Sequence, residues 1–440
     1  MSCEHGPGKC NGRNPSSTAD VVGGLFFPQS KRLGIDLGSY SPAVLERVIY
    51  AGTHHPSFEQ ASQALRHLAD LPIPTKQVER LTQRIGTERC AERDAAVAIY
   101  QGLPLVQRKA APAGVTAPDL AVVQVDGGRL QILDRSARAQ TGPEPASHWR
   151  EDKVGLLASM SSVVSAADPC PTIPEHFVDP LRILRLARDF QGSAGLSEEE
   201  LSTHTPDFSA DEVHANLAPE LEQRSVVATH QEVHRFGEMV AQEAWARGFY
   251  TAPRRAFVAD GSAANWGIWE RHFSNFTPIV DFIHALTYVF SAALAGRSFT
   301  EGWAAYRAWI GQVWAGQIEP VIAALAQRQV ELGPAEDDEP ESSPRQRVAE
   351  ALSYLQNQKE RMRYATYRQQ GLPITSSHIE STIKQVNQRV KGSEKFWSES
   401  GAEAILQLRA DTLSETDPLA SFWQRRQARA TGQRRYKHAA

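Results

Sequence analysis

The order in which strand-like and helix-like segments follow one another constrains the fold of this chain most strongly. A β-rich run at 120–126 is followed by Gly127-Gly128, which predicts a tight turn into a returning strand at 129–133. Further strands are expected at 153–164, 225–228, 255–260 and 277–281, and helices at 230–248 and 266–273 separate the later strands. Beyond residue 281 the hydrophobic pattern predicts helices alone.

An RNase H-like fold has this order of elements: strands first, then alternating helices and strands, and then helices alone. We therefore expect an α/β catalytic domain over 116–440. An acidic insertion at about 165–222 and an all-α insertion at about 297–371 would interrupt it. The chain has 440 residues, more than one compact core usually needs, and its 41% hydrophobic content argues against global disorder.

A second, smaller helical domain is expected at 41–115, after a flexible leader at 1–40. Ser41-Pro42 and Ser57 carry helix-start signals, and a third helix is expected to run from Thr75 to Gly86. That helix would expose residue types that contact phosphates and base edges, namely Lys76, Gln77, Arg80 and Arg84. The pattern predicts helix–turn–helix DNA binding, although small three-helix units with polar outer faces also serve other purposes.

Three carboxylates stand at the ends of expected elements. Asp126 closes the first strand, Asp260 closes the strand after the first long helix, and Glu380 begins a late helix at 377–390. Neighbouring strand ends in an RNase H-like sheet would place the two aspartates in one cleft. Clustered carboxylates repel one another, and hard cations such as Mg²⁺ prefer oxygen ligands. The three acids therefore predict a site for two Mg²⁺ or Mn²⁺ ions that supports phosphoryl transfer.

Each of these acids also has a structural explanation. Asp126-Gly127-Gly128 suits a hairpin turn, Asp260-Gly261-Ser262 suits a helix cap, and Ser377 to Glu380 has the form of a capping box. The occurrence of all three at matching positions favours the catalytic interpretation.

Two further groups of residues have functional and ordinary interpretations. Asp281 and His284 form an acid–imidazole cluster, for which a helix N-cap and a core histidine are the ordinary explanations. Lys384, Arg389 and Lys391 follow Glu380 along its helix and suit contact with a DNA backbone, or else the solvated face of an amphipathic helix.

Charge and cysteine content exclude several classes of protein. The net charge of −4 rules out a uniformly basic chain, whereas 421–440 is basic and suits either phosphate contacts or a merely soluble terminus. The Cys count of 4 is too low for a disulfide scaffold and suits a reducing cytoplasm. Cys3, His5 and Cys10 lack a fourth zinc ligand. We expect no membrane span and, without a phosphate-binding Gly loop, no nucleotide cofactor.

Several blocks of the sequence resemble the DDE transposases of bacterial insertion sequences, specifically the ISKra family. The blocks are VVQVDGGRLQI, HWREDKVG, RGFYTAPRRAFVADGSAANW, FTPIVDFIHALTYVF, GLPITSSHIESTIKQVNQRVKGSEKFW and GAEAILQLRAD. The resemblance covers nearly the whole chain from about residue 30 onward. It implies that Asp126, Asp260 and Glu380 are a catalytic triad and that Asp281 and His284 match a DxxH element. It also implies that the N-terminal helices bind the transposon ends.

The residues and the resemblance together lead us to expect a Mg²⁺-dependent transposase in the bacterial cytoplasm, associated with the nucleoid. It would cleave double-stranded DNA at the element's ends and join them to target DNA, as a dimer or larger assembly on DNA. An RNase H-like nuclease that does not join strands is one alternative. A DNA-binding regulator with an idle metal site is another, and a glycosidase with paired carboxylates is a remote third.

Overall fold

The computed structural model describes residues 40–133, 148–191, 219–336, 338–392 and 394–430, and a few earlier positions. Among those earlier positions, β1 (Ser17–Thr18) and β2 (Leu25–Phe26) pair as antiparallel strands. Cys3, His5 and Cys10 lie outside the described residues, as do most of the leader, part of the acidic insertion and the last residues of the basic tail.

A mixed sheet forms the centre of the described structure. Its order is β5 (Glu220–Thr229), β4 (Trp149–Ser161), β3 (Leu120–Ile132), β6 (Arg254–Ala259) and β7 (Thr277–Val280), and β8 (Phe396–Trp397) also pairs with β3. Only β4 runs antiparallel to its neighbours in this sheet. The expected α/β class is thus confirmed, and this mostly parallel sheet is compatible with an RNase H-like fold.

The hairpin expected at Gly127-Gly128 is wrong. β3 continues through both glycines, Asp126 lies inside the strand, and Gly128 is paired with Asp152 of β4. A Cβ atom at Gly128 would lie 2.9 Å from Oδ1 of Asp152. This glycine therefore leaves space for a neighbouring side chain. In the sequence alone, a glycine of this kind cannot be distinguished from one that forms a turn.

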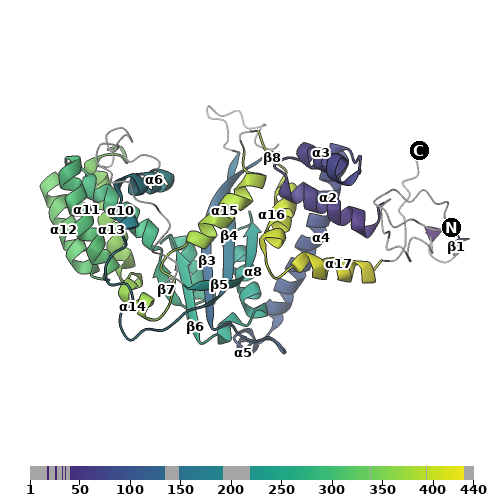
Figure 1. Cartoon of the computed structure of the whole chain (residues 1–440), viewed down its shortest axis with the longest axis horizontal. Coiled ribbons are helices and arrows are strands. Elements are labelled where there is room, and N and C mark those ends of the chain that lie inside the picture. The colour runs from purple at the N-terminus through teal and green to yellow at the C-terminus, as the bar shows by residue number, and fades with distance from the viewer. Residues whose placement is uncertain are drawn as a thin grey trace.

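Helices cover both faces of the sheet (Figure 1). α15 (Ser377–Val390) crosses the front of the sheet in this view and contacts β3 and β4. The opposite face packs on α8 (Val233–Ala246), where a Cβ at Gly155 would come within 2.9 Å of Val240. α9 (Ala263–His272) follows β6, and α16 (Glu399–Leu413) packs against β5.

A helical lobe stands beside β7, at the left of Figure 1. It contains η2 (Glu175–Phe177), α6 (Pro180–Gln191), α10 (Phe282–Leu294), α11 (Phe299–Trp314), α12 (Ile318–Leu332) and α13 (Pro344–Gln358). Within the expected all-α insertion, η5 (Lys359–Arg361) separates α13 from α14 (Tyr364–Gln369). The break brings the Tyr364 hydroxyl to the Val280 carbonyl at 3.1 Å, so that the lobe is bonded to β7.

The N-terminal unit consists of α2 (Pro42–His54), α3 (Phe58–Ala69), α4 (Thr75–Gly102) and the short α5 (Leu105–Arg108). The expected end of the third helix at Gly86 is wrong, since α4 continues to Gly102. Gly86 lies against α16, where an added Cβ would be 2.4 Å from the Ala404 carbonyl oxygen. Here too a glycine marks close packing, in this case of two helices.

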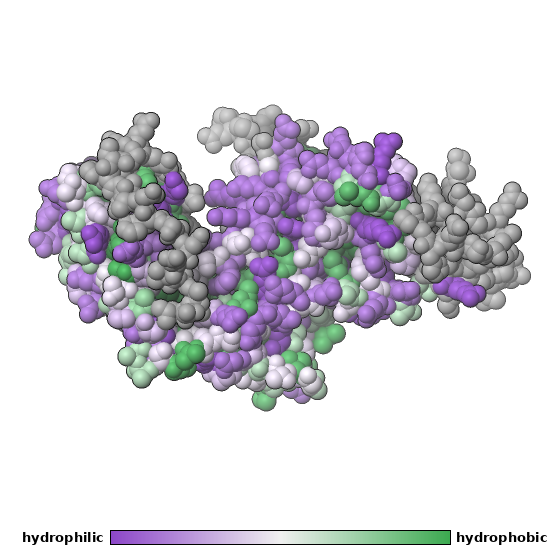
Figure 2. Space-filling view, viewed as in Figure 1, coloured by the Kyte–Doolittle hydropathy of each residue, from purple (hydrophilic) through white to green (hydrophobic). Residues whose placement is uncertain are grey.

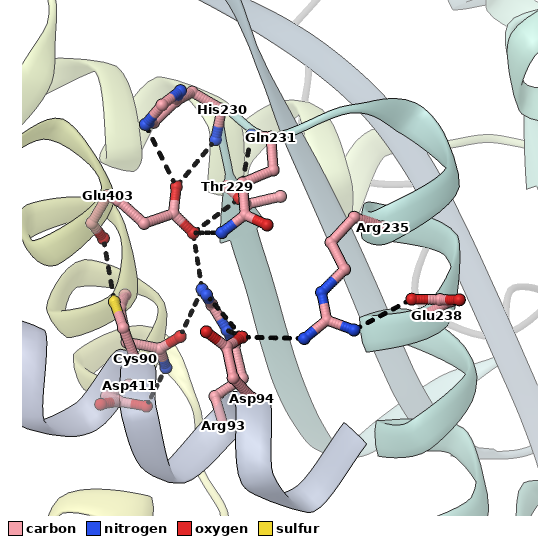
Figure 3. Close-up of polar contacts among 11 residues, drawn as sticks. Cys90, Arg93, Asp94, Thr229, His230, Gln231, Arg235, Glu238, Glu403 and Asp411 are labelled. Carbon is pink, nitrogen blue, oxygen red and sulfur yellow. Dashed lines mark hydrogen bonds and ion pairs between the residues drawn. The ribbon is translucent and has the colours of Figure 1, made fainter. Parts of the chain in front are cut away.

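The second half of α4 is joined to the sheet domain by a buried polar network (Figure 3). Glu403 of α16 accepts hydrogen bonds from Arg93 at 2.7 Å and from the Thr229 hydroxyl at 2.7 Å. Arg89 donates to Asp411 at 2.8 Å and 3.1 Å. The N-terminal helices are therefore docked on the sheet domain, because the first half of α4 packs with α2 and α3 and its second half is bonded to α16, which is bonded in turn to β5.

The described part of the basic tail forms α17 (Pro418–Ala428) and packs beside α4. Arg425 pairs with Glu92 at 2.8 Å, and Arg426 pairs with Glu88 at 2.7 Å. These two arginines are thus engaged within the chain. No helix among the described residues is long and apolar enough to cross a membrane.

Candidate active site

Three aspartates lie at one level of three adjacent parallel strands. Val125 is paired with Ala259, and Ala259 with Val280, so the residues that follow are Asp126, Asp260 and Asp281. The Asp281 N–H donates to the Ala259 carbonyl at 2.9 Å and extends this alignment past the end of β7. The expectation that Asp126 and Asp260 would lie side by side is confirmed by this register.

Asp281 is buried and forms hydrogen bonds with two other parts of the site, the start of α10 and Ser376. Its side chain caps α10 by accepting from the Ile283 N–H at 3.2 Å, and it accepts from His284 Nδ1 at 2.7 Å. It also accepts from the Ser376 N–H at 3.1 Å and the Ser376 hydroxyl at 2.8 Å. Since Asp281 is 0% exposed, this arrangement suits a positioning role for it.

α15 is docked on the sheet by the amide of Gln124, a fully buried residue of β3. Gln124 Oε1 accepts from the Ile379 N–H at 3.1 Å, and its Nε2 donates to the Thr375 carbonyl at 3.3 Å. The Ile379 N–H also donates to the Ser376 carbonyl at 3.0 Å, so the first turn of α15 shares this donor with Gln124. The N-cap is Ser376, and its side chain makes no capping bond, so the box expected at Ser377 to Glu380 is wrong.

The docked helix brings Glu380 into the electrostatic neighbourhood of the aspartates. Burial, and then the charges of Asp281 and Asp126, raise the pKa of Glu380, whereas His284 and Lys384 lower it, and the net result is a pKa of about 7. Burial likewise raises the pKa of Asp126 to about 6, and the charges of Asp260 and Asp281 act in the same direction. Against this, the Gly127 N–H and His284 stabilise the ionised form of Asp126.

His284 is the positive counterpart of these acids. Burial alone would lower the pKa of its imidazole, but its bond to Asp281 and the charges of Asp281, Asp260 and Asp126 raise it to about 9. The imidazolium therefore lies among carboxylates that would otherwise repel one another.

The helical lobe holds the turn that follows β6. Tyr354 of α13 donates its hydroxyl to the Asp260 carbonyl at 2.8 Å, and Gln358 donates to the Gly261 carbonyl at 2.9 Å. Gly261 has a φ of +104°, and a Cβ there would be 2.8 Å from the Tyr354 ring, so only glycine fits. The Asp260 carboxylate accepts from the Ser262 N–H at 2.9 Å and from Asn265 at 2.9 Å.

The acids are neighbours but do not form a closed ligand set. In the described part of the chain, no group of three or more His, Cys, Asp or Glu side chains is arranged to hold one metal ion. Their chemistry nevertheless suits a hard cation, because the donors are carboxylates and at least two are desolvated enough to have raised pKa values.

The expected DNA-binding residues divide into exposed and buried ones. Lys76 and Arg80 on α4, Lys384 on α15 and Lys391 just after α15 are exposed, while Gln77 and Arg84 are partly buried. Lys76 is paired with Glu79 at 2.8 Å, and Arg84 with Glu88 at 3.9 Å. Figure 2 shows a mostly hydrophilic surface over the centre of this face, where α15 lies.

Arg389 does not face solvent, so its assignment to a DNA-contacting surface is wrong. It is 2% exposed, donates to the Gly52 carbonyl at 2.9 Å, and lies 4.4 Å from the centre of the Phe58 ring. Burial, and then the nearby Arg409, lower its pKa to about 10. Its role is to join α15 to the N-terminal unit, since α15 turns this side chain inward.

Sequence reasoning missed two residues that position Glu380. Gln124 is a polar residue inside the apolar run from Leu120 to Val125, and this interruption is the signal that was available. Ser376 stands beside Ser377, and the sequence offers no means of choosing which serine begins the helix.

No protein-family model matches the chain, and no curated protein matches it either.

Proposed function

We propose that this protein is a DDE transposase with an RNase H-like catalytic domain, and that Asp126, Asp260 and Glu380 are its catalytic acids. The observation that carries the proposal is the register that sets Asp126 beside Asp260, with the Glu380 helix docked on β3, the strand that carries Asp126. The resemblance of the surrounding sequence blocks to transposases of the ISKra family supports it.

The residues of the chain would divide the work between binding and positioning. Asp126, Asp260 and Glu380 would hold two Mg²⁺ or Mn²⁺ ions, which supply charge stabilisation at an in-line phosphoryl displacement. Asp281 would fix His284 in place through their hydrogen bond, and the Ser376 hydroxyl, which bonds to Asp281, also lies 3.5 Å from Oε1 of Glu380 and would help to position it. Lys384 on α15 and Lys391 just after it, both exposed, would contact DNA phosphates.

The proposed reaction has two displacements at phosphorus. A water oxygen attacks a phosphodiester at the element's end, and the bond from phosphorus to the 3′ oxygen breaks, which leaves a 3′-hydroxyl and a 5′-phosphate. That hydroxyl then attacks a target phosphodiester, and the target's own 3′ oxygen leaves. Both steps act on paired DNA ends, so a dimer or larger assembly on DNA is part of the proposal.

The test is strand cleavage and joining on labelled DNA that carries the sequences flanking the coding region, with Mg²⁺ or Mn²⁺. Glu380→Gln is compared with wild type, and Glu394→Gln, at an exposed glutamate, is the matched control. Metal-dependent cuts at the ends and joined products, both lost only in Glu380→Gln, are expected. Cutting without joining would favour the RNase H-like nuclease, and binding without any product would favour the regulator.

A further inference from the structure

A second polar cluster lies on the α15 side of the sheet around Gly128, two residues beyond Asp126 on β3. Asp152 of β4 is 0% exposed, and neither of its carboxylate oxygens has a hydrogen-bond partner in another described residue. The side-chain oxygen of Asn387 on α15 is also buried without a partner. A buried carboxylate without a partner is costly, so this arrangement requires a positive or hydrogen-donating group.

The three oxygens converge on one point, above Gly128 of β3. The position of a Cβ at Gly128 is 2.9 Å from Asp152 Oδ1, 3.1 Å from Asp152 Oδ2 and 3.2 Å from Asn387 Oδ1. The missing Cβ therefore leaves a small space that carboxylate and amide oxygens surround. Carboxylate and amide oxygens are the ligands that hard cations prefer.

The charges around the cluster do not already neutralise it by direct pairing. Burial, and then the charge of Glu151, raise the pKa of Asp152, whereas its own backbone N–H, Lys391 and Lys153 lower it, and the net result is a pKa of about 6. Lys153 is paired with Glu151 at 3.1 Å, and Lys391 is exposed at the end of α15. The lysines are thus neighbours that moderate the charge of Asp152 without bonding to its oxygens.

We propose that Asp152 and Asn387 bind a hard, oxygen-liganded cation above Gly128, at a site separate from the three catalytic acids. The bound cation would connect α15 to β4 near the C-terminal end of the helix, just as Gln124 connects its first turn to β3. Because Glu380 is carried by α15, this second connection would stiffen the helix on which the candidate active site depends.

The test uses the full chain with the three acids neutralised as Asp126→Asn, Asp260→Asn and Glu380→Gln, so that ions bound there do not contribute. After treatment with EDTA, thermal unfolding is followed with Mg²⁺, Ca²⁺ or K⁺ added singly. At least one ion is expected to raise Tm saturably, by about 3 °C at a hundredfold excess over its Kd. Adding Asp152→Asn should abolish the rise, whereas Glu151→Gln, at a side chain that is 63% exposed, should leave it unchanged.

A variant expected to bind the cation more tightly shows whether the loss in Asp152→Asn comes from the missing ligand or from misfolding of the variant. Asn387→Asp adds a second carboxylate to the cluster and is expected to tighten cation binding about tenfold or more, since affinity rises with ligand charge. The proposal is overturned if no ion shifts Tm in the neutralised background, or if the shift persists with Asp152→Asn. The first result would mean that the Asn387 amide is rotated and donates to Asp152 directly. Neither result depends on DNA cleavage, so the proposed function is tested separately.

Discussion

Substitution of Gln124 by Met tests how α15 is held on the sheet. Met has a similar volume and keeps the apolar contacts of β3, but it removes both hydrogen bonds of the amide. The Ile379 N–H keeps its bond to the Ser376 carbonyl at 3.0 Å, so the substitution leaves no buried donor without a partner. Each of the two lost hydrogen bonds then contributes about 0.5–1.5 kcal/mol. The expected loss in the free energy of unfolding is therefore about 1–3 kcal/mol.

Urea denaturation of the full chain measures this loss. Gln385→Met is the matched control, because Gln385 lies on the same helix and its side-chain amide makes only an exposed 3.5 Å bond, to Ser381, among the described residues. The control should change stability by no more than about 0.5 kcal/mol. If Gln124→Met also changed it by less than about 0.5 kcal/mol, the amide would not dock α15. The positioning of Glu380 would then need another explanation.

Three more predictions concern the site and its supports. Folding raises the pKa of Glu380 from 4.5 to about 7, so the folded, metal-free protein holds a proton that the unfolded chain releases, and its stability falls as pH rises through this window. Urea unfolding in EDTA should show that Glu380→Gln is more stable than wild type at pH 8 and about as stable as wild type at pH 4.5. The same difference in stability at both pH values would contradict the raised pKa of Glu380. Arg389→Ala should lower the free energy of unfolding by about 2–4 kcal/mol, because it removes a buried link between α15 and the N-terminal unit. Lys384→Ala, at an exposed side chain, should leave stability unchanged and weaken DNA binding in a salt-titrated assay. The reverse outcome would indicate that Arg389, and not Lys384, contacts DNA. Gly86→Ala should cost about 1–3 kcal/mol by forcing α4 from α16, and an unchanged Tm would refute that close contact.

Periodicity and order predicted most of the elements, because burial of apolar residues decides both. The strands at 225–228 and 277–281, and the helices that begin at Ser41-Pro42 and after Asp281, are found where the sequence indicates them. The register of Asp126 beside Asp260 followed from the expected order of strands.

The errors arise where one residue type has two physical uses. Gly86 and Gly128 were interpreted as a helix end and a turn, but both leave room for a neighbouring group that is distant in sequence. Arg389 was interpreted as exposed, because nothing in its helix shows that the N-terminal unit packs over it. Gln124 acts through contacts between elements, and a single sequence does not reveal such contacts.

The central claim, that Asp126, Asp260 and Glu380 act as one centre, is tested most directly by their joint removal. Rates of strand transfer are compared for Asp126→Asn, Asp260→Asn, Glu380→Gln and the triple variant, with DNA binding measured in parallel. Residues that act as a unit show strongly non-additive losses. We predict that each single variant loses as much activity as the triple variant and still binds the DNA ends. A single variant that kept measurable strand transfer, or losses that multiplied from one variant to the next, would contradict the account.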